Sequence, residues 1–127
     1  MGKLAEQGQF QTIMLEVGHF FIFCSDVKRH ADFAQQEGDS STSLAGCGDG
    51  CAIDATLVSQ NRVIAVESMG LGSCYIGGIR DRIETIADLL QLPEHVYPVY
   101  GLSVGHPAHR NPVKSHFYSS AIYHHNH

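Results

Sequence analysis

Residues 67–80 read Glu67-Ser-Met-Gly-Leu-Gly-Ser-Cys-Tyr-Ile-Gly-Gly-Ile-Arg80, and this stretch decides the fold. Gly70 and Gly72 follow a long segment without Gly or Pro, and glycine readily adopts the left-handed conformation in which helices commonly end. Residues 73–77 then predict a short strand, and Gly77-Gly78 predicts a turn into a second helix. The stretch therefore predicts a helix, a strand and a helix in immediate succession.

The segment before this stretch, residues 51–69, is predicted to be a long helix. Its polar residues form two rows at heptad spacing, which are Asp54, Asn61 and Ser68 in one row and Gln60 and Glu67 in the other. Two adjacent rows make one narrow polar stripe, and large apolar residues occupy most of the remaining surface. We therefore expect a mostly buried central helix.

The second helix is predicted to begin at Asp81, because Glu84 follows three residues later in the pattern of a capping box. Its apolar residues recur at the spacing of one helical face, namely Ile83, Ile86, Ala87 and Leu90. Pro93 is expected to stop it.

Two further strands flank these elements. Residues 19–25 are rich in aromatic and branched side chains and are closed by Asp26, as in a strand covered on both faces. Residues 96–104 form the last apolar run, in which Pro98 indicates an edge strand or a bulge. Residues 31–50 are mostly small and polar, so a loop is expected there. The order predicts an α+β fold, an α/β sandwich with a mixed sheet around the buried helix.

Composition narrows the function. The 127 residues, 43% of them hydrophobic, suit a single domain over residues 1–127. A net charge of -5 with scattered Lys and Arg argues against a nucleic-acid partner. No apolar run is long enough to cross a membrane, and the four cysteines have no disulfide-framework spacing. We therefore expect a cytoplasmic protein that binds neither nucleic acid nor membranes.

The Gly77-Gly78 turn is the first candidate site. Glycines where a strand meets a helix let the backbone approach a planar or anionic ligand closely, and Arg80 adds positive charge. Such turns also use glycine for steric reasons alone, so both interpretations remain open on the turn itself.

Five motifs in a fixed order resemble the nitroreductase family, specifically its oxygen-insensitive NADPH nitroreductases and NADPH-dependent FMN reductases. They are Ile53-Asp-Ala-Thr-Leu-Val-Ser-Gln-Asn61, Ala65-Val-Glu-Ser-Met-Gly-Leu-Gly72, Tyr75-Ile-Gly-Gly-Ile-Arg80, Leu92-Pro-Glu-His-Val-Tyr-Pro98 and Gly101-Leu-Ser-Val-Gly-His-Pro107. The resemblance covers the central part of the family and implies a nitroreductase-like fold.

The resemblance implies an FMN-dependent NAD(P)H oxidoreductase that works as a homodimer, with the long helix in the interface. Hydride would pass by a ping-pong reaction through FMN to a nitroaromatic, quinone or flavin acceptor, so no acid or base is required and no catalytic residue is assigned. The residues that match the family's flavin contacts are Gln11, Tyr75, Ile76, Gly77, Gly78, Lys114 and His116.

Two departures from the family shape the expectation. Lys114-Ser-His116 stands where the family has Lys-Pro-Arg, and histidine lacks the fixed donor fork with which arginine holds a phosphate. The family's N-terminal phosphate-clasping motif has no counterpart before Gln11, so the chain looks like the middle of a longer protein. The alternative function is therefore a non-catalytic remnant of the fold that acts as a structural or interaction module without flavin.

The C-terminal segment, residues 106–127, is rich in histidine and offers a rival site. A transition metal could use ligands drawn from His116, His124, His125, His127, Cys47 and Cys51. No HxxxH or CxxC spacing is present, so we favour solvated histidines and assign no metal. Cys24 and Cys74 are expected to be inert buried thiols, and the loop from Cys47 to Cys51 to be more exposed.

Overall fold

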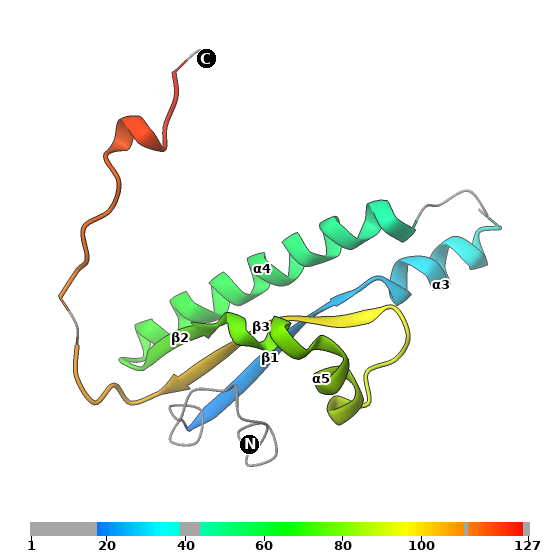
Figure 1. The fold of residues 1–127 in the computed structure, drawn as a ribbon, viewed down its shortest axis with the longest axis horizontal. Helices are drawn as coiled ribbons and strands as arrows, with labels where there is room; N and C mark the ends of the chain where they lie inside the picture. The colour runs from blue at the N-terminus through cyan, green and yellow to red at the C-terminus, as the bar shows by residue number, and fades with distance from the viewer. Residues whose placement is uncertain (1–17, 39–43, 111, 126–127) are drawn as a thin grey trace.

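A computed structural model describes residues 18–38, 44–110 and 112–125. Its centre is a three-stranded sheet in the order β1-β3-β2, made by β1 (His19–Asp26), β3 (Val96–Gly105) and β2 (Gly72–Ile76) (Figure 1). Both neighbouring pairs are antiparallel, so the expectation of a mixed sheet was wrong for the described residues. β1 and β2 run in the same direction but lie on opposite sides of β3, a relation that strand composition does not reveal.

β3 is the central strand, although it contains Pro98. The register shifts between Phe23 and Cys24 of β1, and Cys24 lies opposite Pro98. A proline has no N–H to donate to the ladder, and a register shift at that point relieves the missing bond. The predicted irregularity is confirmed, whereas the alternative of an edge strand was wrong.

The long helix α4 (Leu44–Ser68) begins seven residues before the predicted start at Cys51. It is preceded by α3 (Lys28–Gln36), so the loop expected over residues 31–50 was largely wrong. Gly48 lies inside α4, where its carbonyl accepts hydrogen bonds from Ser25 Oγ at 3.4 Å and Tyr97 Oη at 3.3 Å. These tertiary contacts tie a glycine-rich turn of helix to the sheet and offset its poor helix propensity. The predicted helix end is confirmed, because Gly70 has a φ of 78°.

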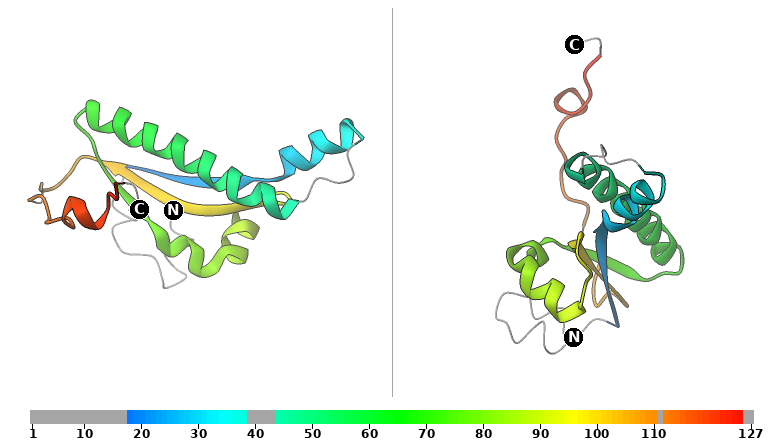
Figure 2. Two further views of the ribbon diagram at one scale, coloured as in Figure 1. Left: turned by 90° about the horizontal axis from the view of Figure 1, so that it is seen from above. Right: turned by 90° about the vertical axis from the view of Figure 1, so that its right-hand side faces the viewer.

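α4 lies along one face of the sheet (Figure 2). Its inner face buries Cys51, Ser59 and Val66. Its outer face, defined here as Ile53, Leu57 and Ile64, is about 60% exposed. The expectation of a mostly buried helix was therefore wrong within this chain, because the described residues supply a packing partner on one side of α4 only.

The opposite face of the sheet is covered by η1 (Gly77–Arg82) and α5 (Ile83–Leu90). Ile79 and Ile86 are fully buried there against Phe20 and Ile22, while Val66 of α4 packs with β3 on the other side. Figure 2 shows the sheet between α4 and α5, so the predicted sandwich has its sheet as the middle layer. α5 begins two residues after Asp81 and has no side-chain cap, so the predicted capping box was wrong.

The C-terminal segment is arranged differently. Residues 112–125 run away from the sheet and include one short turn, η2 (Ser119–Ala121), with exposed side chains throughout (Figure 1). Within the described part of the chain, no helix has the length and apolar character that crossing a bilayer requires.

Candidate functional site

The turn singled out by the sequence lies at one edge of the sheet. Ile76, the last residue of the edge strand β2, pairs with Gly101 of β3 and is buried. Tyr75 before it is 44% exposed, and Gly77 and Gly78 after it are half-buried. The chain thus leaves the sheet through two half-buried glycines that carry no side chain, a geometry that a flat ligand can approach.

Gly101 allows this turn to close onto the sheet. A Cβ on residue 101 would lie 2.7 Å from Ile79 Cδ1 and closer still to the ring of Phe20. Ile79 belongs to η1 and Phe20 to β1. Because Gly101 has no side chain, both of theirs pack against its backbone. The sequence placed Gly101 in a motif but gave no reason for it, because the two neighbours are distant along the chain.

Arg80 borders the turn from the solvent side. A Cβ on Gly77 would lie 3.1 Å from Arg80 Nη2, and Arg80 Nη1 donates to the Val99 carbonyl at 3.5 Å. The guanidinium therefore lies beside the Gly77 backbone, where it can meet an anionic or electron-rich ligand. The α-helical N-terminus expected at this turn is instead the six-residue 3₁₀ helix η1, so the positive field comes from Arg80 more than from a helix dipole.

Ser59 is a site residue that the sequence did not single out. Its hydroxyl is fully buried and lies 3.0 Å from Tyr75 Oη and 2.7 Å from Tyr100 Oη. One signal for it was present: Ser59 falls eight residues after Cys51 and seven before Val66, on the same helical face. A lone hydroxyl on an inner face requires partners, but the sequence does not identify them.

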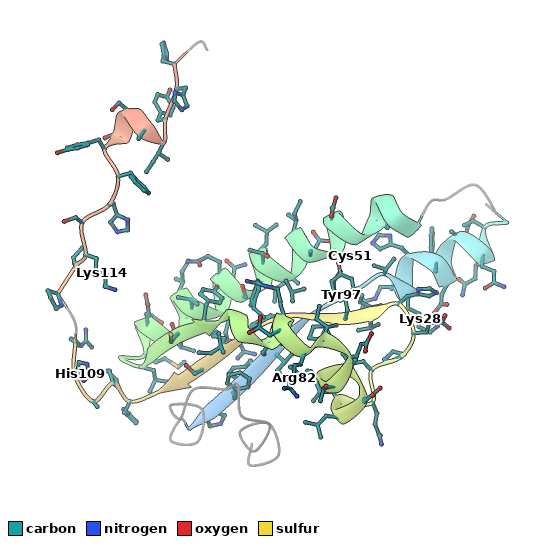
Figure 3. The ribbon with its side chains drawn as sticks, in the orientation of Figure 1. Lys28, Cys51, Arg82, Tyr97, His109 and Lys114 are labelled. Atoms are coloured by element: carbon teal, nitrogen blue, oxygen red, sulfur yellow. The ribbon has the colours of Figure 1, made fainter. Side chains whose placement is uncertain are left out.

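The other predicted flavin contacts are not brought to the turn. Lys114 and His116 lie on the exposed C-terminal segment, and Figure 3 shows Lys114 well away from the sheet. Gln11 lies outside the described residues. The structure of this chain therefore assembles Tyr75, Ile76, Gly77 and Gly78 but not the two residues that match the family's phosphate contacts.

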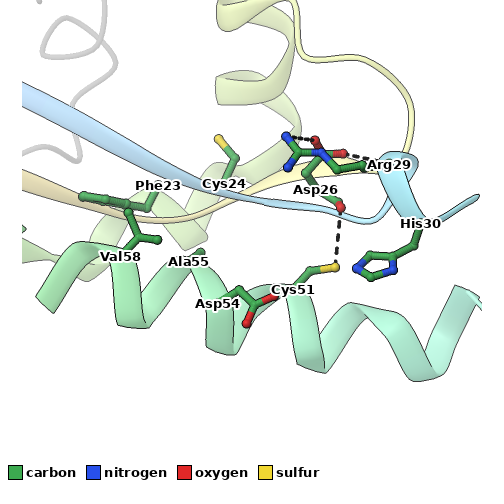
Figure 4. Close-up of a pocket in the computed structure, with 9 residues that line it drawn as sticks. All are labelled: Phe23, Cys24, Asp26, Arg29, His30, Cys51, Asp54, Ala55 and Val58. Atoms are coloured by element: carbon green, nitrogen blue, oxygen red, sulfur yellow. Dashed lines mark hydrogen bonds and ion pairs between the residues drawn. The ribbon is translucent and has the colours of Figure 1, made fainter. Parts of the chain in front are cut away.

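A separate pocket of about 270 Å³ opens between β1, the start of α3 and α4 (Figure 4). Arg29 at its rim is held by Asp26, 3.7 Å away, and Cys51 Sγ donates to the Asp26 carbonyl at 3.4 Å. Phe23 and Val58 give it an apolar wall. None of the predicted flavin contacts lines this pocket.

The cysteines differ from expectation in two places. Cys47 and Cys51 lie inside α4 rather than in a loop, and Cys51 is buried. Burial, reinforced by the neighbouring Cys47, Asp54 and Asp26, raises the pKa of the Cys51 thiol. Burial beside Asp26 also raises the pKa of Cys24, which fits the expected inert thiol. Cys74, expected to be buried, is exposed, because β2 is an edge strand.

The metal interpretation gains no support from the described residues. In that part of the chain, no group of three or more His, Cys, Asp or Glu side chains is close enough to hold an ion. His127 lies outside it. Cys47 and Cys51 lie on α4, whereas the C-terminal histidines lie on the exposed segment that runs away from it.

The fold and site together define an α+β sandwich with a glycine turn at one edge of its sheet. The chain belongs to the nitroreductase family, whose family model matches residues 11–106. It is 46% identical over 112 residues to the FMN reductase (NADPH) of Bacillus subtilis, covering 86% of this chain and 45% of that protein.

Two further proteins agree with this assignment. The oxygen-insensitive NADPH nitroreductase of Salmonella typhimurium is 36% identical over 91% of this chain and 47% of its own length. The solved structure of NfrA2 from B. megaterium superposes with a TM-score of 0.87 at 34% identity, covering 98% of this chain and 51% of that one. The predicted nitroreductase-like α+β fold is confirmed. The chain spans about half the length of the curated relatives it matches.

Proposed function

We propose that this chain forms part of an FMN-dependent NAD(P)H oxidoreductase of the nitro-, quinone- or flavin-reductase type. The observation that carries the proposal is the glycine turn at the sheet edge, where Tyr75 is exposed, Gly77 and Gly78 are half-buried, and Arg80 lies alongside. The names of the relatives, an FMN reductase that uses NADPH and an NADPH nitroreductase, support the same chemistry.

The residues of the turn fit a flavin. Gly77 carries no Cβ, and among the described residues the only non-neighbouring atoms near the place where one would stand are those of the flexible Arg80 guanidinium, so a planar ring system can approach the backbone once that side chain moves. Ile76 is buried, so its contribution comes from its backbone, and the exposed ring of Tyr75 can cover one side of the ligand. Bound FMN supplies the hydride chemistry, accepting from NAD(P)H and passing to the acceptor. The protein's part is to bind, orient and shield it.

The phosphate end of FMN is assigned to the C-terminal segment. Lys114 and His116 are proposed to engage the phosphate, together with Gln11 near the flavin. The C-terminal segment is exposed and runs away from the turn, so these contacts require that the segment folds back or comes from a second copy of the chain. Histidine at position 116 predicts weaker phosphate binding than arginine would give.

A homodimer is part of the same proposal. The outer face of α4 presents Ile53, Leu57 and Ile64 to solvent on one long helix, and exposed apolar surface of this kind is typical of an interface. A second copy would cover it. We also place the protein in the cytoplasm, where NADPH is available, and its four free cysteines fit a reducing compartment.

Colour is the direct test. The purified full chain, incubated with excess FMN and desalted, is expected to be yellow with a flavin absorbance band that bleaches when NADPH is added under anaerobic conditions. Free FMN passed through the same column without protein controls for carry-over. A protein that stays colourless overturns the proposal and leaves the flavin-free module as the function.

A further inference from the structure

The buried Ser59 hydroxyl is a junction of three hydrogen bonds. Ser59 Oγ donates to the Thr56 carbonyl at 2.8 Å, which uses its one proton. Tyr75 Oη at 3.0 Å and Tyr100 Oη at 2.7 Å must therefore both donate to Ser59 Oγ. With one proton given and two received, the hydroxyl is fully satisfied.

The junction joins three elements at one point. Ser59 lies on α4, Tyr75 on β2 and Tyr100 on β3, and the two tyrosine rings meet edge to face at 5.3 Å between centroids. Tyr75 is the second-last residue of β2, directly before the turn at Gly77. β2 is short and pairs with β3 on one side only, so a bond from its exposed Tyr75 to α4 adds a restraint that strand pairing does not supply.

Tyr75 also has a second possible acceptor. Its hydroxyl lies 3.5 Å from Gln60 Oε1, a long contact compared with the 3.0 Å bond to Ser59. Gln60 is exposed, so that bond competes with water and holds the ring weakly. Ser59 is therefore the group that fixes the direction in which Tyr75 points.

We infer that Ser59 and Tyr100 are positioning residues that hold Tyr75 and, through it, the backbone of residues 75–78 in the geometry of the ligand site. The identity of the ligand rests on the proposed function, whereas the effect of Ser59 on Tyr75 does not depend on it. Ser59 is fully buried, so it acts on the site through Tyr75 and not by contact with a ligand. The effect of both positioning residues is to keep the end of β2 in place before the ligand arrives, which lowers the ordering cost of binding.

Three variants separate positioning from packing. Ser59→Ala removes the junction oxygen and leaves the hydroxyl of the half-buried Tyr100 without its Ser59 partner. Tyr100→Phe removes that hydroxyl and keeps the Ser59–Tyr75 bond. The double variant has no stranded hydroxyl, so it is expected to recover much of the stability that Ser59→Ala loses, while Tyr75 remains untied.

A matched control is available on the same helix. Ser68 also donates to the carbonyl three residues before it, Ala65, at 2.7 Å, but it is exposed and has no tyrosine partner. Ser68→Ala therefore reproduces the loss of a back-bonded serine hydroxyl without disturbing β2.

The first measurement is amide hydrogen exchange of the ligand-free full chain, followed by mass spectrometry. In Ser59→Ala and in the double variant, the peptide covering residues 72–78 is expected to exchange about tenfold faster, the effect of losing one buried hydrogen bond. Residues 83–90 of α5 should exchange at the rate of the unmodified protein, and Ser68→Ala should change neither peptide. An unchanged rate at residues 72–78 in Ser59→Ala overturns the inference whether or not the protein binds flavin.

The second measurement is FMN affinity by quenching of flavin fluorescence. Ser59→Ala and the double variant are expected to raise the dissociation constant about tenfold, and Ser59→Thr, which restores the hydroxyl, to return it towards the original value. If the double variant recovers both stability and FMN affinity, the junction is merely structural. If the unmodified chain binds no FMN, the proposed function fails while the exchange experiment still decides the positioning.

Discussion

Gly101 of β3 lies against the side chain of Ile79 so closely that any Cβ on residue 101 would overlap it. The overlap is worse with the ring of Phe20, which belongs to the neighbouring strand. Gly101→Ala is therefore expected to lower the free energy of unfolding by about 1–3 kcal/mol, the usual cost of forcing extra volume into a packed core. Urea denaturation followed by circular dichroism measures it.

The control for this substitution is Gly50→Ala. Gly50 lies in α4, is exposed, and has no atom within 4 Å of a Cβ built on it. The added methyl should stabilise the helix by up to about 1 kcal/mol, because alanine is the better helix former. Equal effects of the two substitutions would contradict the packing argument.

Gly77→Ala tests the turn without disturbing the core. The new Cβ would meet the end of the flexible Arg80 side chain at 3.1 Å, and that side chain can move away. Stability should therefore change by less than about 1 kcal/mol, whereas FMN affinity should fall about tenfold because the methyl displaces the Arg80 guanidinium from its place beside the turn. Thermal unfolding and fluorescence titration give the two values. Unaltered FMN affinity would remove residue 77 from the site.

Leu57→Glu tests the outer face of α4. Leu57 is 61% exposed in the single chain, so a glutamate there costs little in folding but would be buried in a dimer interface that covers this face. We expect analytical ultracentrifugation to show a dimer for the unmodified chain and a monomer for this variant. Gln35→Glu adds the same charge on α3 and should leave the dimer intact. A dimer that persists in Leu57→Glu would place the interface elsewhere.

The buried thiol of Cys51 is expected to make the free energy of unfolding depend on pH in the alkaline range. Because burial raises the pKa of its thiol above the usual value of about 8.5, the unfolded chain loses this proton at a lower pH than the folded chain does. The contribution of the protonated Cys51 thiol to the free energy of unfolding is complete below the pKa that the thiol has in the unfolded chain. It declines as pH rises from there through the pKa of the thiol in the folded chain. The free energy of unfolding should fall as pH rises above the unfolded pKa of this thiol, and Cys51→Ala should flatten that fall. Cys74→Ala, at an exposed thiol, is the comparison.

Local signals predicted the elements whose causes are local. The aromatic and branched run at residues 19–25 became β1, and Gly70 ended the long helix in the left-handed conformation expected of it. The misses had tertiary causes. Gly48 continues α4 because Ser25 and Tyr97 hold its carbonyl, and β3 is central despite Pro98 because the register shifts opposite it.

The candidate site was half predictable for the same reason. Residues 75–78 are contiguous, so a motif marked them. Ser59 and Tyr100 are 41 residues apart, and only the packing of α4 on the sheet brings their hydroxyls to 2.7 Å. Lys114 and His116 are the opposite case. A sequence motif marked both, but they lie on the exposed C-terminal segment, and Figure 3 shows Lys114 away from the turn.

By itself the sequence determined the family of this protein and the place of its glycine turn, because motif order and backbone freedom are properties of the chain. The tertiary structure alone decided which residues support that turn. Ile79 packs against Gly101, and Tyr75 is hydrogen-bonded to Ser59, and both pairs are far apart in the sequence. Within the described residues, the tertiary structure also left the outer face of α4 exposed. A helix whose polar residues form only a narrow stripe requires burial, but which layer provides it depends on what packs against each face.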